Sequence, residues 1–221
     1  MAKNITIVTY DWVPEFPRGF VRDIRARWAA NEARIAYDIE TVPFKEKSGL
    51  HREMQPFEQV PILKAGNLSL FESGAILLYL AEKSEALMPH DEVGRAETIQ
   101  WVIAALNSVE PFTVNWLVAK VFLQNEEQAS AAAGLMNQRL ESLARVLESR
   151  EFIAAGRFTV ADIITADVLR VIARQGVLDN FPILAKYVER LTARPAFLAA
   201  YNAQMAHWRA ADARQQALGP S

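Results

Sequence analysis

The sequence predicts two domains of different fold class, an α/β domain followed by an all-α domain. Short runs of alternating, β-branched residues, which are typical of strands, occur only within the first 71 residues. After residue 92 the apolar residues recur at helical spacing and no convincing strand follows. Residues 85–91 break the pattern and are expected to form a linker. We therefore place the domains at residues 1–84 and 92–208, with a loosely held polar tail at 209–221.

The first domain is expected to follow the order β-α-β, loop, β-β-α. Pro14 and Pro17 make the segment after the first strand a loop, and Gly66-Asn67 is a turn signal between two short strands. A polar, proline-bearing stretch at 45–58 indicates a loop that can hold one helical turn. The predicted elements are strands over 5–10, 37–42, 61–64 and 69–71, and helices over 18–33 and 73–84.

The second domain is expected to be helical throughout. Pro111 should bend or interrupt its first helix, because a proline inside a helix removes a backbone hydrogen bond. Thr159 can cap the backbone N–H of Asp162, and Asp162 can return a bond to the N–H of Thr159. Capping therefore accounts for Asp162, and no catalytic role is assigned to it. The predicted helices cover residues 92–123, 126–148, 159–173, 181–193 and 195–208.

The composition excludes several classes of function. A net charge of −2 gives no basic excess for binding nucleic acid, and the arginines at 18–27 are interpreted as a solvated helix face. The absence of cysteine excludes disulfides, thiolate metal sites and cysteine nucleophiles, and the scattered histidines predict no metal site. The N-terminus lacks the apolar core of a signal peptide, and no run approaches the ~20 apolar residues of a membrane span. These features indicate a cytoplasmic protein without a membrane partner.

Two stretches carry the strongest functional signal. In the first, Gln55 to Leu63, a proline after Val60 belongs on a strand edge or in a turn, and the Val60-Pro61 bond can be cis at a cost of roughly 0.5–1 kcal/mol. In the second, Leu70 to Leu80, Glu72-Ser73 precedes an apolar run that predicts a helix from Ser73, whose free N–H groups favour an anion. Open strand backbone beside a helix N-terminus and a carboxylate makes a site for an extended, zwitterionic peptide.

These stretches resemble the glutathione-transferase family. The resemblance rests on Gln-Val-Pro-Ile-Leu followed by Phe-Glu-Ser-Gly-Ala-Ile, and on the Thr159 capping box and Tyr187-x-x-Arg-Leu-Thr-Ala-Arg-Pro195. It implies a thioredoxin-like first domain with a mixed four-stranded sheet and the family's helical second domain. It also implies that glutathione is the co-substrate, that Val60 pairs with its cysteinyl backbone, and that Glu72 and Ser73 hold its γ-glutamyl end. The glutathione-binding residues implied in this way are Gln59, Val60, Pro61, Glu72, Ser73 and, for the glycyl carboxylate, Lys47.

A transferase of this family must hold the glutathione thiol as a thiolate, although a free cysteine thiol has a pKa of about 8.5. One hydrogen bond to a charged acceptor contributes about 1.5–3 kcal/mol, which lowers that pKa by roughly one to two units. The family usually supplies the donor from Tyr, Ser or Cys, yet residues 11–36 contain no serine, cysteine, threonine or tyrosine. Three alternatives stay open: the hydroxyl of Tyr10, the guanidinium of Arg18, and backbone N–H groups of the loop between them.

An apolar electrophile needs apolar residues facing the thiol. Large apolar side chains in a surface loop are costly unless they line a pocket or an interface. On the first helix of the second domain, ordinary helix packing is the competing explanation. The candidate pocket residues are Trp12, Val13 and Phe16 in the loop, and Phe112 and Trp116 on that helix.

The sequence thus favours a glutathione transferase that activates the thiol for attack on a small hydrophobic electrophile. A peroxidase or isomerase that uses glutathione belongs to the same class and has the same sequence signal. The alternative is a non-catalytic module of the same fold that binds a ligand or another protein, which the missing hydroxyl donor favours. The resemblance also implies a homodimer.

Overall fold

The computed structural model of the chain describes residues 4–46 and 48–218. They fall into two compact units, one drawn from Met1–Lys83 together with Pro195–Ser221 and the other from Ser84–Arg194. The first unit is therefore built from both ends of the sequence. Each unit has its own buried apolar core.

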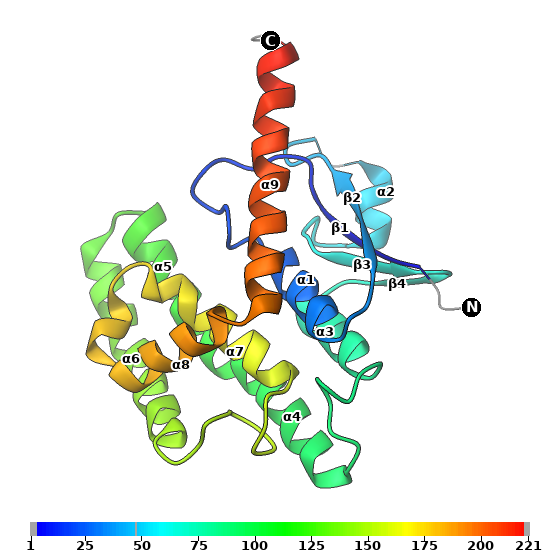
Figure 1. Ribbon diagram of the computed structural model, residues 1–221. Coiled ribbons are helices and arrows are strands. Elements are labelled where there is room, and N and C mark those ends of the chain that lie inside the picture. The colour runs from blue at the N-terminus through cyan, green and yellow to red at the C-terminus, as the bar shows by residue number, and fades with distance from the viewer. Residues whose placement is uncertain (1–3, 47, 219–221) are drawn as a thin grey trace. The chain divides into compact units, whose positions relative to one another are not determined.

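The first unit contains a mixed four-stranded sheet in the order β2-β1-β3-β4. Its strands are β1 (Ile5–Tyr10), β2 (Tyr37–Val42), β3 (Ile62–Ala65) and β4 (Leu68–Leu70). β1 runs parallel to β2 and antiparallel to β3, so that Ile7 lies opposite both Ile39 and Leu63. The expected thioredoxin-like α/β class and the hairpin around Gly66 are confirmed (Figure 1).

Three helices of the N-terminal segment accompany the sheet: α1 (Asp23–Glu32), α2 (Gly49–Met54) and α3 (Ser73–Ala81). The apolar pattern predicts a helix from Arg18, but α1 begins at Asp23, five residues later. The residues before it form turns, because Gly19 has φ +81°, a value that a regular right-handed helix cannot contain. The solvated arginine face is also wrong: Arg25 and Arg27 are 1% and 2% exposed.

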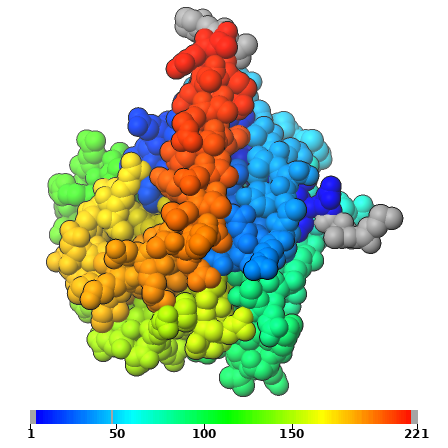
Figure 2. Space-filling view, in the orientation of Figure 1, coloured from blue at the N-terminus to red at the C-terminus, as the bar shows by residue number. Residues whose placement is uncertain are grey.

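The last helix, α9 (Pro195–Leu218), packs against α1 within the first unit. The loosely held tail predicted from residue 209 is therefore wrong for residues 209–218, which continue this helix. Trp208 and Ala211 are buried, and the rings of Trp28 and Phe197 lie 4.8 Å apart. In Figure 2 the orange and red atoms of α9 lie against the blue atoms of the N-terminal segment.

The second unit is helical in all its regular elements. It comprises α4 (Glu92–Ala104), η1 (Ala105–Val109), α5 (Glu110–Leu117), η2 (Val118–Phe122), α6 (Glu126–Leu147), α7 (Val160–Ala173), η3 (Val177–Asn180) and α8 (Pro182–Thr192). The interruption predicted at Pro111 is the π-helical turn η1, which ends just before the proline. By length and composition Glu92–Phe122 reaches the threshold of a membrane span, a threshold that core helices also reach.

The capping box predicted at the start of α7 is present. The N–H of Thr159 donates to Asp162 over 2.9 Å, and the Thr159 hydroxyl caps the first turn in return. Asp162 also accepts from the N–H of Ile153 over 2.9 Å and from the hydroxyl of Tyr187 over 2.7 Å. This carboxylate therefore joins the start of α7 to the preceding loop and to α8.

Candidate functional site

The Val60-Pro61 corner lies where the chain enters β3. The bond is cis, as the sequence allowed, and Val60 is buried with Val8, Val42 and Ile62. Within residues 4–46 and 48–218, the backbone N–H and C=O of Val60 take part in no hydrogen bond. An unpaired donor and acceptor on adjacent strand-like backbone can pair with an extended peptide, as in strand addition.

His51 holds this corner from α2, a contact that the sequence did not reveal. Its Nε2 lies 3.0 Å from the carbonyl oxygen of Gln59, and its side chain is fully buried. Because a carbonyl oxygen only accepts, Nε2 carries the proton and donates. His51 therefore fixes the peptide that leads into Val60, whereas the Gln59 side chain is exposed. In the sequence the scattered histidines predict no metal site, and no local pattern indicates this contact.

The start of α3 presents the second half of the site. Glu72 adopts φ +67° and is exposed, and its carboxylate bonds to no residue that the structure describes. Ser73 is buried, and its hydroxyl oxygen accepts from Nη1 of Arg25 over 3.0 Å. A buried cation thus lies behind the helix N-terminus, which itself favours an anion. The result is a carboxylate and an anion-binding helix end at neighbouring residues.

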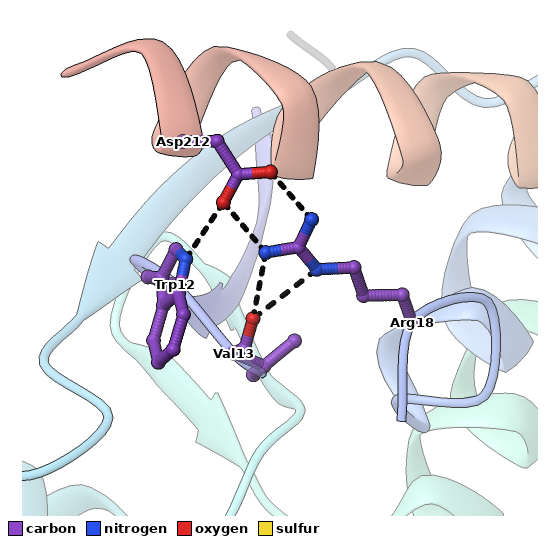
Figure 3. A network of polar contacts seen from close by, with 4 residues as sticks. All are labelled: Trp12, Val13, Arg18 and Asp212. Carbon is purple, nitrogen blue, oxygen red and sulfur yellow. Dashed lines mark hydrogen bonds and ion pairs between the residues drawn. The ribbon is translucent and has the colours of Figure 1, made fainter. Parts of the chain in front are cut away.

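The loop after β1 is held by a network of Trp12, Val13, Arg18 and Asp212 (Figure 3). Nη1 and Nη2 of Arg18 donate to the two carboxylate oxygens of Asp212 over 2.5 and 2.6 Å. Nε and Nη2 of Arg18 also donate to the carbonyl of Val13 over 3.2 and 3.0 Å. The indole N–H of Trp12 donates to Asp212 over 2.9 Å. Both edges of the guanidinium are therefore used within the protein.

Tyr10 ends β1 and has its own hydrogen-bond partner. Its hydroxyl donates to the carbonyl of Glu58 over 3.2 Å, and its ring meets Phe44 edge-on at 5.2 Å. Burial, helped by the nearby Glu58 carboxylate, raises the pKa of Tyr10 above its usual value. The phenol thus keeps its proton and links the strand to the Val60 corner.

The remaining candidate residues are dispersed. In the loop after β1, Val13 is buried and Phe16 is 37% exposed. Phe112 and Trp116 lie on α5 of the second unit, where Arg139 stacks 4.8 Å above the Phe112 ring. Lys47 lies outside the described residues. Among the residues that are described, no group of three or more His, Asp or Glu side chains is arranged to hold a metal ion.

Comparison with known proteins identifies both parts of the chain. The model of the glutathione S-transferase N-terminal domain matches residues 17–82, and that of the glutathione S-transferase C-terminal domain matches residues 98–195. The disulfide-bond oxidoreductase YfcG of Escherichia coli is 33% identical over 132 residues, which cover 58% of this chain and 61% of that protein, less than two thirds of its length. A probable maleylacetoacetate isomerase 2 of Drosophila melanogaster is 29% identical over 191 residues, covering 80% of this chain and 82% of that one.

Solved structures share the fold. A glutathione transferase family member from Pseudomonas fluorescens pf-5, crystallised with two glutathione bound, superimposes with a TM-score of 0.77. The alignment covers 90% of this chain and 92% of that chain at 23% identity. At this identity the likeness concerns the fold.

Proposed function

Because this chain belongs to the glutathione S-transferase family, we propose that it binds glutathione and activates its thiol for attack on a small hydrophobic electrophile. The observation that carries the proposal is the pairing of an open Val60 backbone with the Glu72-Ser73 helix start in one unit. Together they offer a zwitterionic peptide both open backbone groups and a site for its charged end.

Glutathione would lie extended along the Val60-Pro61 corner. The N–H and C=O of Val60 would pair with the cysteinyl backbone, beside Gln59 and Pro61. The Glu72 carboxylate would accept from the γ-glutamyl ammonium, and the Ser73 hydroxyl and first N–H groups of α3 would donate to the γ-glutamyl carboxylate. Each such charge-assisted hydrogen bond contributes about 1.5–3 kcal/mol. Lys47 is proposed for the glycyl carboxylate.

Thiol activation is assigned to the loop after β1. Tyr10 and Arg18 both have partners within the protein, which supports backbone donors over either side chain. The N–H groups of Trp12 and Val13 donate to no described residue. A thiolate accepting from them would then form a bond to the electrophilic carbon. In a substitution the leaving group departs with its electron pair; in an addition the π bond of the electrophile breaks, its electron pair moves to the neighbouring atom, and that atom takes a proton from water. Trp12, Val13 and Phe16 of the first unit are proposed to bind the electrophile.

An ultraviolet titration of bound glutathione tests this proposal. In the wild type, thiolate absorbance should show ionisation at least one unit below the free pKa of about 8.5. The shift should survive in Tyr10→Phe if backbone groups are the donors. If glutathione binds but its thiol titrates as in water, the transferase proposal fails and the non-catalytic binding module replaces it.

A second candidate is a glutathione-dependent reduction of disulfides. It is favoured by the 33% identity to a disulfide-bond oxidoreductase. Because the present chain has no cysteine, the two thiols that reduce a disulfide must both come from glutathione. One glutathione thiolate attacks a disulfide sulfur, forms a mixed disulfide and releases one thiolate. A second attacks the glutathione sulfur of that intermediate, giving glutathione disulfide and the other thiolate, so two electrons pass to the substrate. A small symmetric disulfide, assayed for glutathione disulfide formation, distinguishes this activity from conjugation.

Homodimerisation is proposed on the same premise. Light scattering on the purified protein should give twice the mass of 24.8 kDa for one chain. A mass equal to a single chain would contradict it.

A further inference from the structure

One helix supplies a row of contacts to the segment that follows β1. Tyr201 packs against Gly19, where an added Cβ would lie 2.8 Å from the Tyr201 ring. The Gln204 amide donates to the carbonyl of Val21 over 2.9 Å, and Nε2 of His207 lies 2.9 Å from the carbonyl of Tyr10. Asp212 completes the row by accepting from Trp12 and Arg18. These α9 residues recur every three to five positions, which keeps them on one side of the helix.

The segment has little regular structure of its own. Residues 11–22 form turns and bends, with prolines at 14 and 17. The N–H of Asp11 donates to the carbonyl of Val42 over 2.8 Å, which ties the start of the segment to β2. Beyond that point the turn bonds from Arg18 N–H to the Glu15 carbonyl and from Phe20 N–H to the Pro17 carbonyl shape the loop, and side chains from α9 add contacts at both its ends.

Asp212 has the chemistry to fix two points of the loop at once. A guanidinium and a carboxylate that share two parallel hydrogen bonds hold each other in a defined plane. One carboxylate oxygen also accepts from the Trp12 indole, and Arg18 in turn holds the Val13 carbonyl (Figure 3). The direction of the Trp12 and Val13 peptides is therefore set through Asp212.

We propose that Asp212 is a positioning residue for the thiol, acting through Trp12 and Arg18 on the backbone groups that face it. This inference rests on the proposed function, since it concerns the same loop donors. The glutathione contacts proposed at Val60, Glu72 and Ser73 do not include the loop. Loss of Asp212 should therefore impair activation of the thiol and leave glutathione binding largely intact.

Asp212→Asn is the primary test, because asparagine keeps the shape of the side chain and an oxygen for Trp12 while removing the charge. We expect kcat for conjugation to fall about 10- to 100-fold, since misplacement of reacting groups by about 1 Å can cost that much. KM for glutathione should stay within about twofold, and the pKa of the bound thiol should rise by about one unit. Amide hydrogen exchange in residues 11–21 should become faster than in the wild type.

Two comparisons make the test specific. Glu126→Gln, at the start of α6 and far from the loop in sequence, removes an exposed ion pair with Lys120 of η2 and should change none of these quantities. Arg18→Ala should have the same effects as Asp212→Asn, and the double variant should be no worse than either alone. If Arg18→Ala abolishes the thiol shift while Asp212→Asn preserves it, Arg18 is itself the donor and the positioning role is overturned.

The outcomes also separate this inference from the proposed function. If the wild type lowers the thiol pKa and Asp212→Asn matches it in every readout, only the positioning role fails. If the wild type binds no glutathione, the proposed function fails. Faster exchange in residues 11–21 of Asp212→Asn would then show that Asp212 holds the loop but serves no thiol chemistry. The proposed positioning role for the thiol would fail together with the proposed function.

Discussion

Ser73 accepts a hydrogen bond from Arg25 within the protein, with an oxygen-to-nitrogen distance of 3.0 Å. Arg25 is 1% exposed, so its charge acts in a region of low dielectric behind the first turn of α3. The buried arginine orients the Ser73 hydroxyl beside the first turn of α3. The same hydroxyl can donate outward to a carboxylate, because a serine oxygen both accepts and donates.

Ser73→Ala should therefore weaken glutathione binding and lower stability. Loss of one charge-assisted hydrogen bond should raise Kd about tenfold, and loss of the buried bond from Arg25 should cost about 1–3 kcal/mol of unfolding free energy. Calorimetric titration and urea unfolding measure the two effects. Ser69→Ala, at an exposed position of β4, should change the unfolding free energy by less than about 0.5 kcal/mol. Unchanged affinity in Ser73→Ala would remove Ser73 from the site.

His51→Phe tests whether α2 positions the Val60 corner. Phenylalanine retains the ring volume but cannot donate to Gln59, so the Val60 peptide should lose its fixed orientation. We expect Kd for glutathione to rise about tenfold, equivalent to about 1.4 kcal/mol. Hydrogen exchange over residues 58–62 should also become faster. His90→Phe, at an exposed site in the other unit, is the matched control, and equal effects from both substitutions would exclude a local role.

Tyr187→Phe probes the carboxylate at the start of α7. Burial, together with Asp162, raises the pKa of Tyr187 well above its usual value, so the hydroxyl keeps its proton and donates. Removing it should cost about 1–2 kcal/mol, whereas Asp162→Ala should cost about 3 kcal/mol or more because several buried donors lose their acceptor. Urea unfolding of the two variants measures whether Asp162→Ala loses more unfolding free energy than Tyr187→Phe. An equal loss in both variants would mean that Tyr187 is the dominant partner.

The pH dependence of stability should carry the signature of Asp212. Hydrogen bonds from Arg18 and Trp12 lower the pKa of Asp212 to about 2. Because the folded pKa lies below the unfolded value, the ion pair stabilises the fold above about pH 4, and that contribution is lost as the pH falls through about 2. Urea midpoints measured from pH 5 down to pH 2.5 should therefore fall less steeply in Asp212→Asn. Parallel pH profiles would show that the ion pair contributes nothing.

The parts of the molecule that the sequence predicted are those encoded by neighbouring residues. Local backbone preferences predict a cis bond at Val60-Pro61 and a helix start at Ser73, and both are present, although the corner leads into β3, an interior strand, and not into a strand at the edge of the sheet. The Thr159 capping box was readable for the same reason, since its two members lie three residues apart.

What the sequence did not reveal depends on partners distant in the chain. Asp212 lies 194 positions from Arg18, so a polar stretch without an apolar face indicated a tail. Arg27 is buried because Asp23, one helical turn earlier, neutralises it over 2.6 Å, although periodicity alone favoured a solvated face. The late start of α1 follows from the positive φ of Gly19, a conformation that Tyr201 then covers.

Because the first unit contains both ends of the chain, it can fold completely only late in synthesis. Its sheet and α1 are synthesised before the second unit, but α9 leaves the ribosome only after residues 84–194 have been made. Domains tend to fold as they emerge from the ribosome. The first unit therefore lacks α9 until the helical unit has been synthesised. A ribosome-bound chain arrested before residue 195 should consequently expose Trp28 to solvent quenchers, and full protection should arrive only with the release of α9.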